Sequence, residues 1–424
     1  MAAPTEGGLG SRVFGTGINR RRLGWLGLAA VLAVLAPWIL ELVVGFGLLD
    51  SAAFQLKILT TALIFAMLAT AFNLLYGYTG LLSFGHAMFV AIAGYSVAKV
   101  VQVVAPALGI GEIFGGIAVF VTWLLAVAIG TLMATLLAIG IGYLSVRLEE
   151  IYFALITLSF SMAIWVIANQ DIIGSLLEAL GYGNGVFTNG SDGLTFTMGD
   201  VNLFGWEFTL VDIVNPIAYY FLMLIAFTLV MYILWRIVQS PFGATCKAIR
   251  ENPERAEALG VNVTRHQWLT FIISGAFSGM AGAMLIPLLA NVNPDQAYWT
   301  FSALPVLMTV IGGAYAFLGP LVGAFAYEYL RWAISQYAFL EAYWQFSFGI
   351  LLLIVVLYFP NGVHGGLERL ADWLRAAGRR TRNEGPAGLA AFLMETAVDV
   401  GTRLAAAGRS IGAAVRRLLS RLGV

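Results

Sequence analysis

Apolar residues fill long stretches of the chain, and short polar segments separate these stretches. A transmembrane helix needs about 20 predominantly apolar residues. Ten stretches follow this pattern, near 24–44, 56–76, 86–105, 113–143, 151–169, 213–235, 267–289, 300–313, 319–337 and 343–359. The fourth is longer than one crossing requires and is expected to tilt or break, while the eighth is short. The pattern predicts an all-α polytopic membrane protein with about ten transmembrane helices, and counts of nine or eleven are alternatives.

The composition agrees with lipid as the main solvent. The mean hydropathy is +0.86 and only 11% of the residues are charged, whereas soluble domains carry about 25%. Cys246 is the single cysteine, which excludes an intramolecular disulfide, and three scattered histidines offer no spacing for metal ligands. We expect no metal site. A membrane-embedded enzyme would need a convergent set of His, Cys, Asp or Ser, and the sequence shows none, so no catalytic residue is assigned.

The distribution of positive charge predicts the orientation. Basic residues gather in the arm 1–23, in the loop 236–266 and in the tail 360–424, whereas the loop 170–212 contains six acidic residues and no Lys or Arg. Cytoplasmic segments of membrane proteins are enriched in Lys and Arg. Ten spans within the domain 24–359 would therefore place both termini and the loop 236–266 in the cytoplasm. The acidic loop would then be extracytoplasmic.

A compact charged segment, "CKAIRENPERAEALGVNV" at residues 246–263, interrupts this hydrophobic chain. Asn252 followed by Pro253 suits a helix N-cap and first turn. Gly260 can adopt the positive φ that often follows a helix end. These signals predict a short helix near 253–259 between two spans. A solvated connector with surface charges is the alternative.

Two glycine-rich segments, 77–87 and 312–324, lie where consecutive predicted spans meet, with polar groups near membrane depth. Glycines weaken a continuous helix by roughly 1 kcal/mol each relative to alanine, and a broken backbone is tolerated in a bilayer only where protein buries it or where it lines a cavity. Close helix packing through small residues is the alternative. His86, next to the first segment, is expected to be a hydrogen-bonded structural residue. The candidates for a translocation path are Asn73, Gly77, Gly80, Ser83, Gly85, Gly312 and Gly313.

Five motifs together resemble one known family. The stretch "AIRENPERAEALGVNVTRHQWLTFIISGAFSGMAGAM" is similar to the cytoplasmic coupling-loop region of branched-chain amino acid permeases of the LIV type, the membrane subunits of ATP-binding-cassette (ABC) importers. The segments 73–95, 189–194, 310–324 and 360–366 resemble that family in the same order. The resemblance covers roughly residues 56–367, and its combination of motifs is specific although each piece alone is weak.

The resemblance implies a role for the charged segment. In this family a short cytoplasmic helix docks in a cleft of the ATPase subunit, and the resemblance assigns that role to Glu254, Arg255, Ala256 and Gly260. It also implies a homologous permease subunit, two ATPase subunits that bind ATP and Mg, and an extracytoplasmic binding protein. The implied location is a prokaryotic cell (inner) membrane. No cofactor in this chain and no nucleic-acid partner are expected.

The acidic loop contains a candidate docking surface for the binding protein. It comprises Asn189, Gly190, Ser191, Asp192 and Gly193. Relatives often have two adjacent glycines after the threonine, and Asn189 replaces the first of them here. The acidic excess of the loop has an alternative explanation, since basic residues are simply retained inside.

The chain itself has no phosphate-binding loop of the ATPase type. Such a loop needs a lysine directly after a glycine, and the three lysines follow Leu56, Ala98 and Cys246. The expected cargo is a branched-chain or other neutral amino acid, with urea, short amides and aromatic acids as alternatives. An ion-coupled secondary transporter is the rival class, and Glu328 with Arg331 would be its deep charged pair. The second part of the tail 360–424 has the pattern of an amphipathic membrane-surface helix, with a solvated tail as the alternative.

Overall fold

The structure is a computed structural model, and it describes residues 20–45, 51–181, 186–203, 206–211 and 216–337, with a few isolated positions between 339 and 365. The chain divides into two units, Met1–Val363 and His364–Val424. The first unit contains every helix and strand discussed below. Residues 1–19 of the basic arm and almost all of the tail with its predicted amphipathic helix lie outside the described residues, whereas residues 20–23 of the arm already belong to the first helix.

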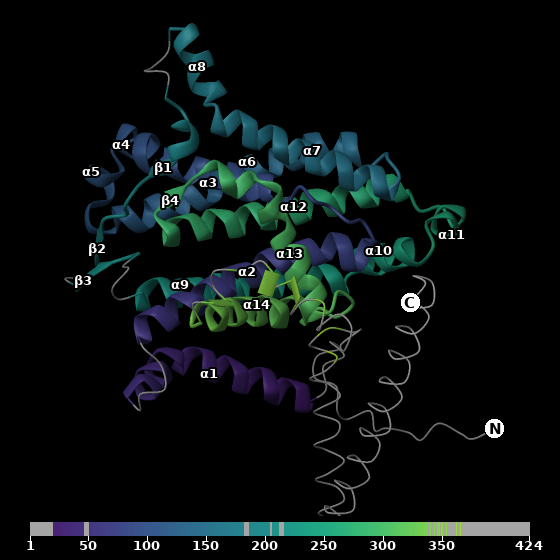
Figure 1. Ribbon diagram of the computed structural model, residues 1–424, viewed down its shortest axis with the longest axis horizontal. Helices are drawn as coiled ribbons and strands as arrows, with labels where there is room; N and C mark the ends of the chain where they lie inside the picture. The colour runs from purple at the N-terminus through teal and green to yellow at the C-terminus, as the bar shows by residue number, and fades with distance from the viewer. Residues whose placement is uncertain are drawn as a thin grey trace, which may run out of the picture. The chain divides into compact units, whose positions relative to one another are not determined.

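Long helices make up most of the first unit (Figure 1). They are α1 (Arg20–Gly45), α2 (Ala52–Thr79), α3 (His86–Lys99), α6 (Ala118–Ser145), α7 (Glu150–Asn169), α9 (Ile217–Gln239), α12 (Val263–Leu289), α13 (Trp299–Gly312) and α14 (Gly319–Ser335). The shorter helices are η2 (Val100–Val104), α4 (Ala105–Ala107), α5 (Ile110–Phe114), η3 (Gly115–Ile117), α8 (Ile172–Ala179), η4 (Gly190–Asp192), α10 (Pro241–Glu251), α11 (Pro253–Ala258) and η5 (Pro294–Ala297). A predominantly helical architecture is therefore confirmed for the described part of the chain, and the strands in it are two to four residues long.

Six of the described helical segments are long and apolar enough to cross a membrane. They are Ala52–Thr79, His86–Ala107, Ile110–Ser145, Ile151–Asn169, Ile217–Gln239 and Val263–Leu289. The 14-residue α13 spans about 21 Å at 1.5 Å per residue, less than the ~30 Å hydrocarbon core. The predicted span 343–359 lies largely outside the described residues. The chain is a multi-pass membrane protein, and the count of ten spans stays a prediction.

The fourth predicted stretch is interrupted near its beginning, and α6 then continues without a break for 28 residues. Gly115 has φ 51°, and the three-residue turn η3 separates α5 from α6. Only glycine adopts such a positive φ without steric cost. Gly116 next to it packs so closely on Asn202 that a Cβ would clash with the Asn202 carbonyl. The break therefore lets the chain pack closely against the strand that contains Asn202.

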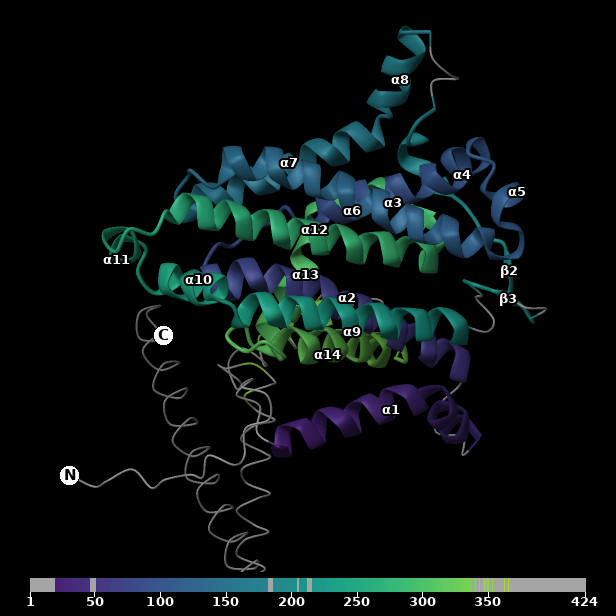
Figure 2. The same ribbon diagram turned by 180° about the vertical axis from the view of Figure 1, so that it is seen from behind.

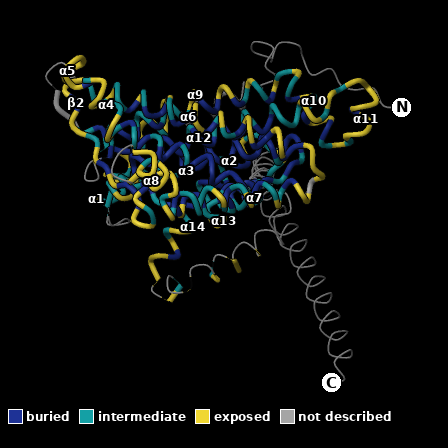
Figure 3. Tube along the Cα trace, turned by 90° about the horizontal axis from the view of Figure 1, so that it is seen from above, coloured by how far each residue is buried: buried dark blue, intermediate teal, exposed yellow. Residues whose placement is uncertain are grey.

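Helix α2 lies at the centre of the bundle. In its most apolar stretch 89% of the residues are buried, against 22% for α7. Figure 3 shows the same contrast, with α2 and α3 mostly dark blue. Helices α6 and α12 pack through small residues, since Cβ atoms added at Gly275 and Gly279 would press on Ala138 and Ala134. The exposed faces are apolar, for example Leu155 on α7 and Leu229 on α9, as a lipid-facing surface requires.

Four short strands form two small sheets that the sequence pattern did not predict. Strand β1 (Leu194–Thr195) pairs antiparallel with β4 (Asn291–Val292), and β2 (Asp200–Leu203) pairs antiparallel with β3 (Trp206–Thr209). Strands of two to four residues are too short to show the alternation that identifies a strand. The β1–β4 pair joins the acidic loop to the segment that follows α12.

The charged loop and the acidic loop lie at opposite ends of the helices. Helices α10 and α11 lie at one end, and α5, β2 and β3 at the other, in both views (Figure 1, Figure 2). We call these the α11 end and the β2–β3 end. The arrangement places the basic segment 236–266 and the acidic segment 170–212 on the two sides that the charge distribution requires. Which of them faces the cytoplasm stays a prediction.

The orientation can be tested by thiol labelling. Cys246 has no exposed surface, so it cannot report sidedness and should first be replaced by serine. In that background Ser191→Cys and Ala248→Cys introduce thiols at exposed positions of the two ends. We expect an impermeant thiol reagent to label Ser191→Cys in intact cells and Ala248→Cys only after permeabilisation. The opposite pattern would contradict the predicted orientation.

Candidate functional site

Helix α11 begins where the sequence predicted. Asn252 has an extended backbone (φ −163°, ψ 100°), and its Oδ1 accepts a hydrogen bond of 2.7 Å from the Arg255 backbone N–H. Pro253 occupies the first helical position, where its missing N–H costs nothing. The expected helix near 253–259 is thus confirmed as Pro253–Ala258. Asn252 is the only residue between α10 and α11, so the two helices form one bent element.

The end of α11 is fixed by backbone hydrogen bonds. Gly260 has φ 86°, its N–H donates to the Glu257 carbonyl at 2.8 Å, and the Val261 N–H donates to the Ala256 carbonyl at 3.1 Å. This pair of bonds is a Schellman motif, which requires a left-handed residue at Gly260. Asn262 then caps α12 by accepting from the Arg265 N–H at 2.9 Å. Local hydrogen bonds therefore define the shape of this loop.

The four predicted coupling residues occupy three different environments. Glu254 and Arg255 are exposed, and Gly260 shapes the exit from the helix. Ala256 is 3% exposed and packs toward the rest of the chain. Leu259 beside them is 80% exposed. An exposed leucine next to exposed charges on a rigid helix can bind a protein groove, with the charges setting the register.

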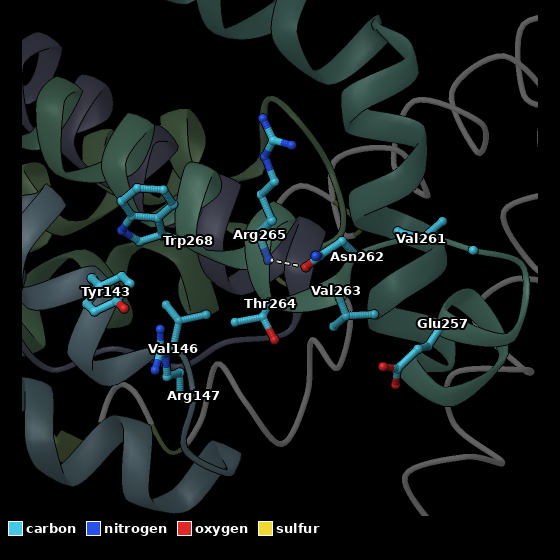
Figure 4. Close-up of a pocket in the computed structure, with 12 residues that line it drawn as sticks. Tyr143, Val146, Arg147, Glu257, Val261, Asn262, Val263, Thr264, Arg265 and Trp268 are labelled. Carbon is cyan, nitrogen blue, oxygen red and sulfur yellow. Dashed lines mark hydrogen bonds between the residues drawn. The ribbon is translucent and has the colours of Figure 1, made fainter.

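An open groove of about 740 Å³ lies beside α11 (Figure 4). The end of α6, the exit of α11 and the start of α12 line it. The Arg147 guanidinium lies 4.2 Å from the centre of the Tyr143 ring, and Trp268 Nε1 donates to the Ile139 carbonyl at 3.1 Å. Glu257 and Thr264 also face this groove. Arg147 and Glu257 of α11 therefore line one groove, although 110 residues separate them in the sequence.

The first glycine-rich segment contains one break. Helix α2 continues through Gly77 and ends at Thr79, and the break begins at Gly80, which has φ 86°. Gly77 is needed for close packing, because a Cβ there would clash with Asn73 Oδ1 and the Ala314 carbonyl. Close approach therefore explains Gly77, and backbone geometry explains Gly80. A Cβ at Gly85 would lie 2.8 Å from the Thr157 carbonyl.

Side chains of other helices satisfy the broken backbone. The Phe84 N–H donates to Thr157 Oγ1 at 3.3 Å, and the Ala87 N–H donates to Ser302 Oγ at 3.0 Å. Ser83 is fully buried and its Oγ accepts from the Gly85 N–H at 3.2 Å. In this conformation the break is buried in protein, and a place for these residues on the translocation path stays a prediction.

His86 is a structural histidine, as expected. Its Nε2 lies 2.8 Å from Ser274 Oγ, and that hydroxyl donates to the Ala71 carbonyl at 2.7 Å. The imidazole packs edge-on against Phe72 and Phe89. The ring thus joins α3 to α12 and α2 at the point where the break ends.

The second glycine-rich segment lies against the first. Gly313 has φ 108° where α13 ends, and a Cβ at Gly312 would clash with the Gly319 carbonyl, so α13 and α14 pack backbone on backbone. The turn 313–318 returns to α2, where Asn73 Nδ2 donates to the Ala316 carbonyl at 3.5 Å. Candidates far apart in sequence are therefore neighbours at the α11 end.

One carboxylate organises the predicted docking loop at the β2–β3 end. Asp171 accepts backbone N–H bonds of 2.9–3.1 Å from Gly174, Phe187, Thr188 and Asn189. Partial burial raises the pKa of Asp171, but the hydrogen bonds from Thr188, Phe187 and Gly174 outweigh it, and the net pKa lies below its ordinary value. The sequence counted Asp171 only as one acid among six.

The loop that Asp171 holds leaves part of the predicted docking surface exposed. Asn189, Ser191 and Asp192 are exposed, Gly190 is half-buried and Gly193 is buried. Asn189 adopts φ 62°, a left-handed conformation that asparagine tolerates better than most residues. A Cβ at Gly193 would clash with the Val292 carbonyl, so this glycine permits the β1–β4 pairing. The loop therefore presents three polar side chains from a fixed backbone.

Comparison with known proteins decides the family. A family model described as the permease component of the branched-chain amino acid transport system matches residues 54–356. The chain belongs to this permease family. It is accordingly an ABC transporter permease, a transport subunit rather than an enzyme, and the resemblance noted in the sequence is confirmed.

Individual relatives carry the same description. The chain is 26% identical over 348 residues to the high-affinity branched-chain amino acid transport system permease protein LivM of Escherichia coli K12, which covers 79% of this chain and 74% of the relative. It is 26% identical over 338 residues to the probable branched-chain amino acid transport permease protein LivM of Methanocaldococcus jannaschii, and the aligned part covers 71% of this chain and 90% of the relative. It is also 26% identical over 313 residues to the permease protein LivH of Escherichia coli K12, and the aligned part covers 72% of this chain and 92% of the relative. No solved structure matches the chain.

Gly77→Ala should destabilise the permease, although alanine is the better helix former. The added methyl group meets Asn73 Oδ1 and the Ala314 carbonyl, and overpacking of this kind costs typically about 1–3 kcal/mol. Gly140→Ala on α6 is the matched control, because a Cβ there meets nothing within 4 Å. Thermal unfolding in detergent should show a lower midpoint for Gly77→Ala only. Equal thermal midpoints for the two variants would contradict the close contact between α2 and the turn 313–318.

Asp171→Asn should loosen the acidic loop. Amide exchange at Phe187, Thr188 and Asn189 should become about tenfold faster or more, which corresponds to about 1.4 kcal/mol, whereas the exposed control Asp192→Asn should leave it unchanged. Because the folded pKa lies below the ordinary value of 3.8, the carboxylate stabilises the loop above that pH. This stabilisation is lost as the pH falls through the folded pKa. The difference in thermal midpoint between parent and Asp171→Asn should therefore shrink below pH 3.8; a constant difference would contradict the assignment.

Proposed function

We propose that this chain is the membrane permease subunit of a binding-protein-dependent importer for branched-chain or other neutral amino acids, driven by ATP hydrolysis in separate subunits. The observation that carries the proposal is helix α11, which is exposed, rigidly capped and located in the basic loop. The members of the family are permease components, and α11 supplies the surface through which such a component would contact an ATPase.

The shape of the loop suits docking more than it suits a plain connector. A connector needs no fixed geometry, whereas α11 has an N-cap, a proline at its first position and a Schellman exit. Arg255 and Glu254 can pair with charges of a partner while Leu259 enters an apolar groove. Ala256 then anchors the helix to its own chain, since its methyl group is turned inward.

The same reasoning defines the partners. Relatives named LivM and LivH both match this chain, and this supports a homologous permease subunit as the membrane partner. Two ATPase subunits would bind ATP and Mg and dock at the cytoplasmic side. The exposed Asn189, Ser191 and Asp192 would contact an extracytoplasmic substrate-binding protein. The complex would lie in a prokaryotic cell membrane with both termini of this chain in the cytoplasm, and no nucleic acid is involved.

The substrate class rests on the names of the relatives and on the apolar interior. A neutral side chain needs no counter-ion along a route with few charges. Urea, short amides and aromatic acids are the alternative cargoes. Identification of the ligand of the cognate binding protein would decide among them.

Ion coupling is the competing mechanism, and one residue favours it. Glu328 on α14 is 6% exposed, and its Oε1 has no hydrogen-bond partner among the described residues. Arg331, its predicted partner, is exposed. The charge of Arg331 still acts on this carboxylate. A buried carboxylate is what ion coupling needs, but membership in a family of ABC permeases favours ATP as the energy source.

Charge reversal at Arg255 tests the docking role. Arg255→Glu should reduce co-purification with the ATPase, because a repulsive charge replaces an attractive one in the interface; we expect a loss on the order of 2 kcal/mol, roughly 30-fold in affinity. Gly260→Val should impair docking too, since a β-branched residue strongly disfavours φ 86°. Both variants should insert normally.

Arg236→Glu is the matched control, since Arg236 is also an exposed cation, at the end of α9. It should retain the ATPase and parental uptake. If Arg255→Glu assembled and transported like the parent, α11 would be a solvated connector and the docking proposal would be wrong.

A further inference from the structure

The C-terminal turn of α2 receives its positive charge from another helix. The last carbonyls of a helix lack intrahelical partners, and a cation near them is favourable. Helix α2 has no basic residue in its last turn. The Gly80 N–H donates to the Tyr76 carbonyl at 3.0 Å and the Leu81 N–H to the Leu75 carbonyl at 3.2 Å. The Gly77 carbonyl instead accepts from Arg250 Nη1 of α10.

Arg250 also contacts the second glycine-rich segment. Its Cζ lies 5.0 Å from the centre of the Tyr315 ring, and Tyr315 belongs to the turn that follows Gly313. Gly80 makes room for it, since a Cβ at Gly80 would lie 3.2 Å from Arg250 Cγ. One guanidinium therefore touches the end of α2 and the turn between α13 and α14. Lysine would replace it only in part, because a compact ammonium can donate to the carbonyl but cannot present a flat face to the ring at the same time.

Arg250 is close to α11 along the chain and is firmly held. Only Glu251 separates it from Asn252, the residue that caps α11. On the same helix Cys246 and Ile249 are fully buried, and Cys246 Sγ lies 3.4 Å from Thr270 Oγ1 of α12. Lys247 adds a second cation, 5.3 Å above the Tyr78 ring. A displacement of α11 therefore reaches α2 through a short and packed route.

We propose that Arg250 is the positioning residue that transmits movement of α11 to the two glycine-rich segments. When α11 shifts, the guanidinium carries the Gly77 carbonyl and Tyr315 with it, so the end of α2 and the turn 313–318 move together. The break at Gly80–Gly85 lies directly beyond that point in the chain. This inference rests on the proposed function, because it needs an ATPase that moves α11.

The test is the ratio of substrate transported to ATP hydrolysed by the assembled complex in proteoliposomes. Arg250→Gln removes the charge and the ring contact from a residue outside the docking surface. We expect the ATPase to co-purify and hydrolyse ATP at the parental basal rate, while transport per ATP falls at least tenfold. Arg250→Lys should restore part of the ratio. Arg236→Gln is the control and should leave the ratio at the parental value.

A merely structural role predicts a different result. If Arg250 only stabilised the fold, Arg250→Gln would lower the thermal midpoint and the yield without changing the ratio of transport to ATP hydrolysis in the complexes that assemble. A parental ratio in Arg250→Gln would therefore overturn the inference while leaving the proposed function intact. If the parent chain itself bound no ATPase, the proposed function would be wrong instead. Should Arg250→Gln fail to assemble, Tyr315→Leu replaces it, since Tyr315 is 77% exposed. A lowered ratio in that variant supports the inference, and a parental ratio contradicts it.

Discussion

An interrupted helix inside a bilayer must find hydrogen-bond partners within the protein, because no water is present to supply them. In this permease the interruption between α2 and α3 is largely buried in protein, so the same constraint applies to its backbone groups. Thr157 of α7 and Ser302 of α13 accept from its free backbone N–H groups. Both helices must therefore approach the break, and the short α13 lies across the bundle to reach it (Figure 1).

The same constraint explains why the candidate segments gather at one end. Near the end of α2, the Gly77 carbonyl still needs a hydrogen-bond donor, and Arg250 of α10 supplies it. The turn 313–318 packs on the same helix end, where Gly77 leaves just enough space. The charged loop and both glycine-rich segments thus form one contact cluster. Movement of any member changes the contacts of the others, as coupling between an ATPase and a membrane path requires.

Local signals were readable from the sequence, and contacts between distant segments were not. Helix α11 was predicted to within a residue because Asn252, Pro253 and Gly260 determine its ends through nearby bonds. The break was placed less accurately, since helix packing at Gly77 outweighs the cost of glycine in a helix. Asp171 was missed because three of its four backbone donors lie 16 to 18 residues further along the chain. No pattern in the sequence links these donors to one carboxylate.

Measurement of the energy source for uptake distinguishes an ATP-driven importer from an ion-coupled transporter. The complete assembly of two permease subunits, two ATPases and the binding protein would be reconstituted in proteoliposomes, and uptake of a radiolabelled neutral amino acid measured with ATP or with an imposed ion gradient. We expect uptake that follows ATP hydrolysis and disappears when the ATPases are omitted. Uptake by this chain and its membrane partner alone, driven by the ion gradient, would contradict this expectation.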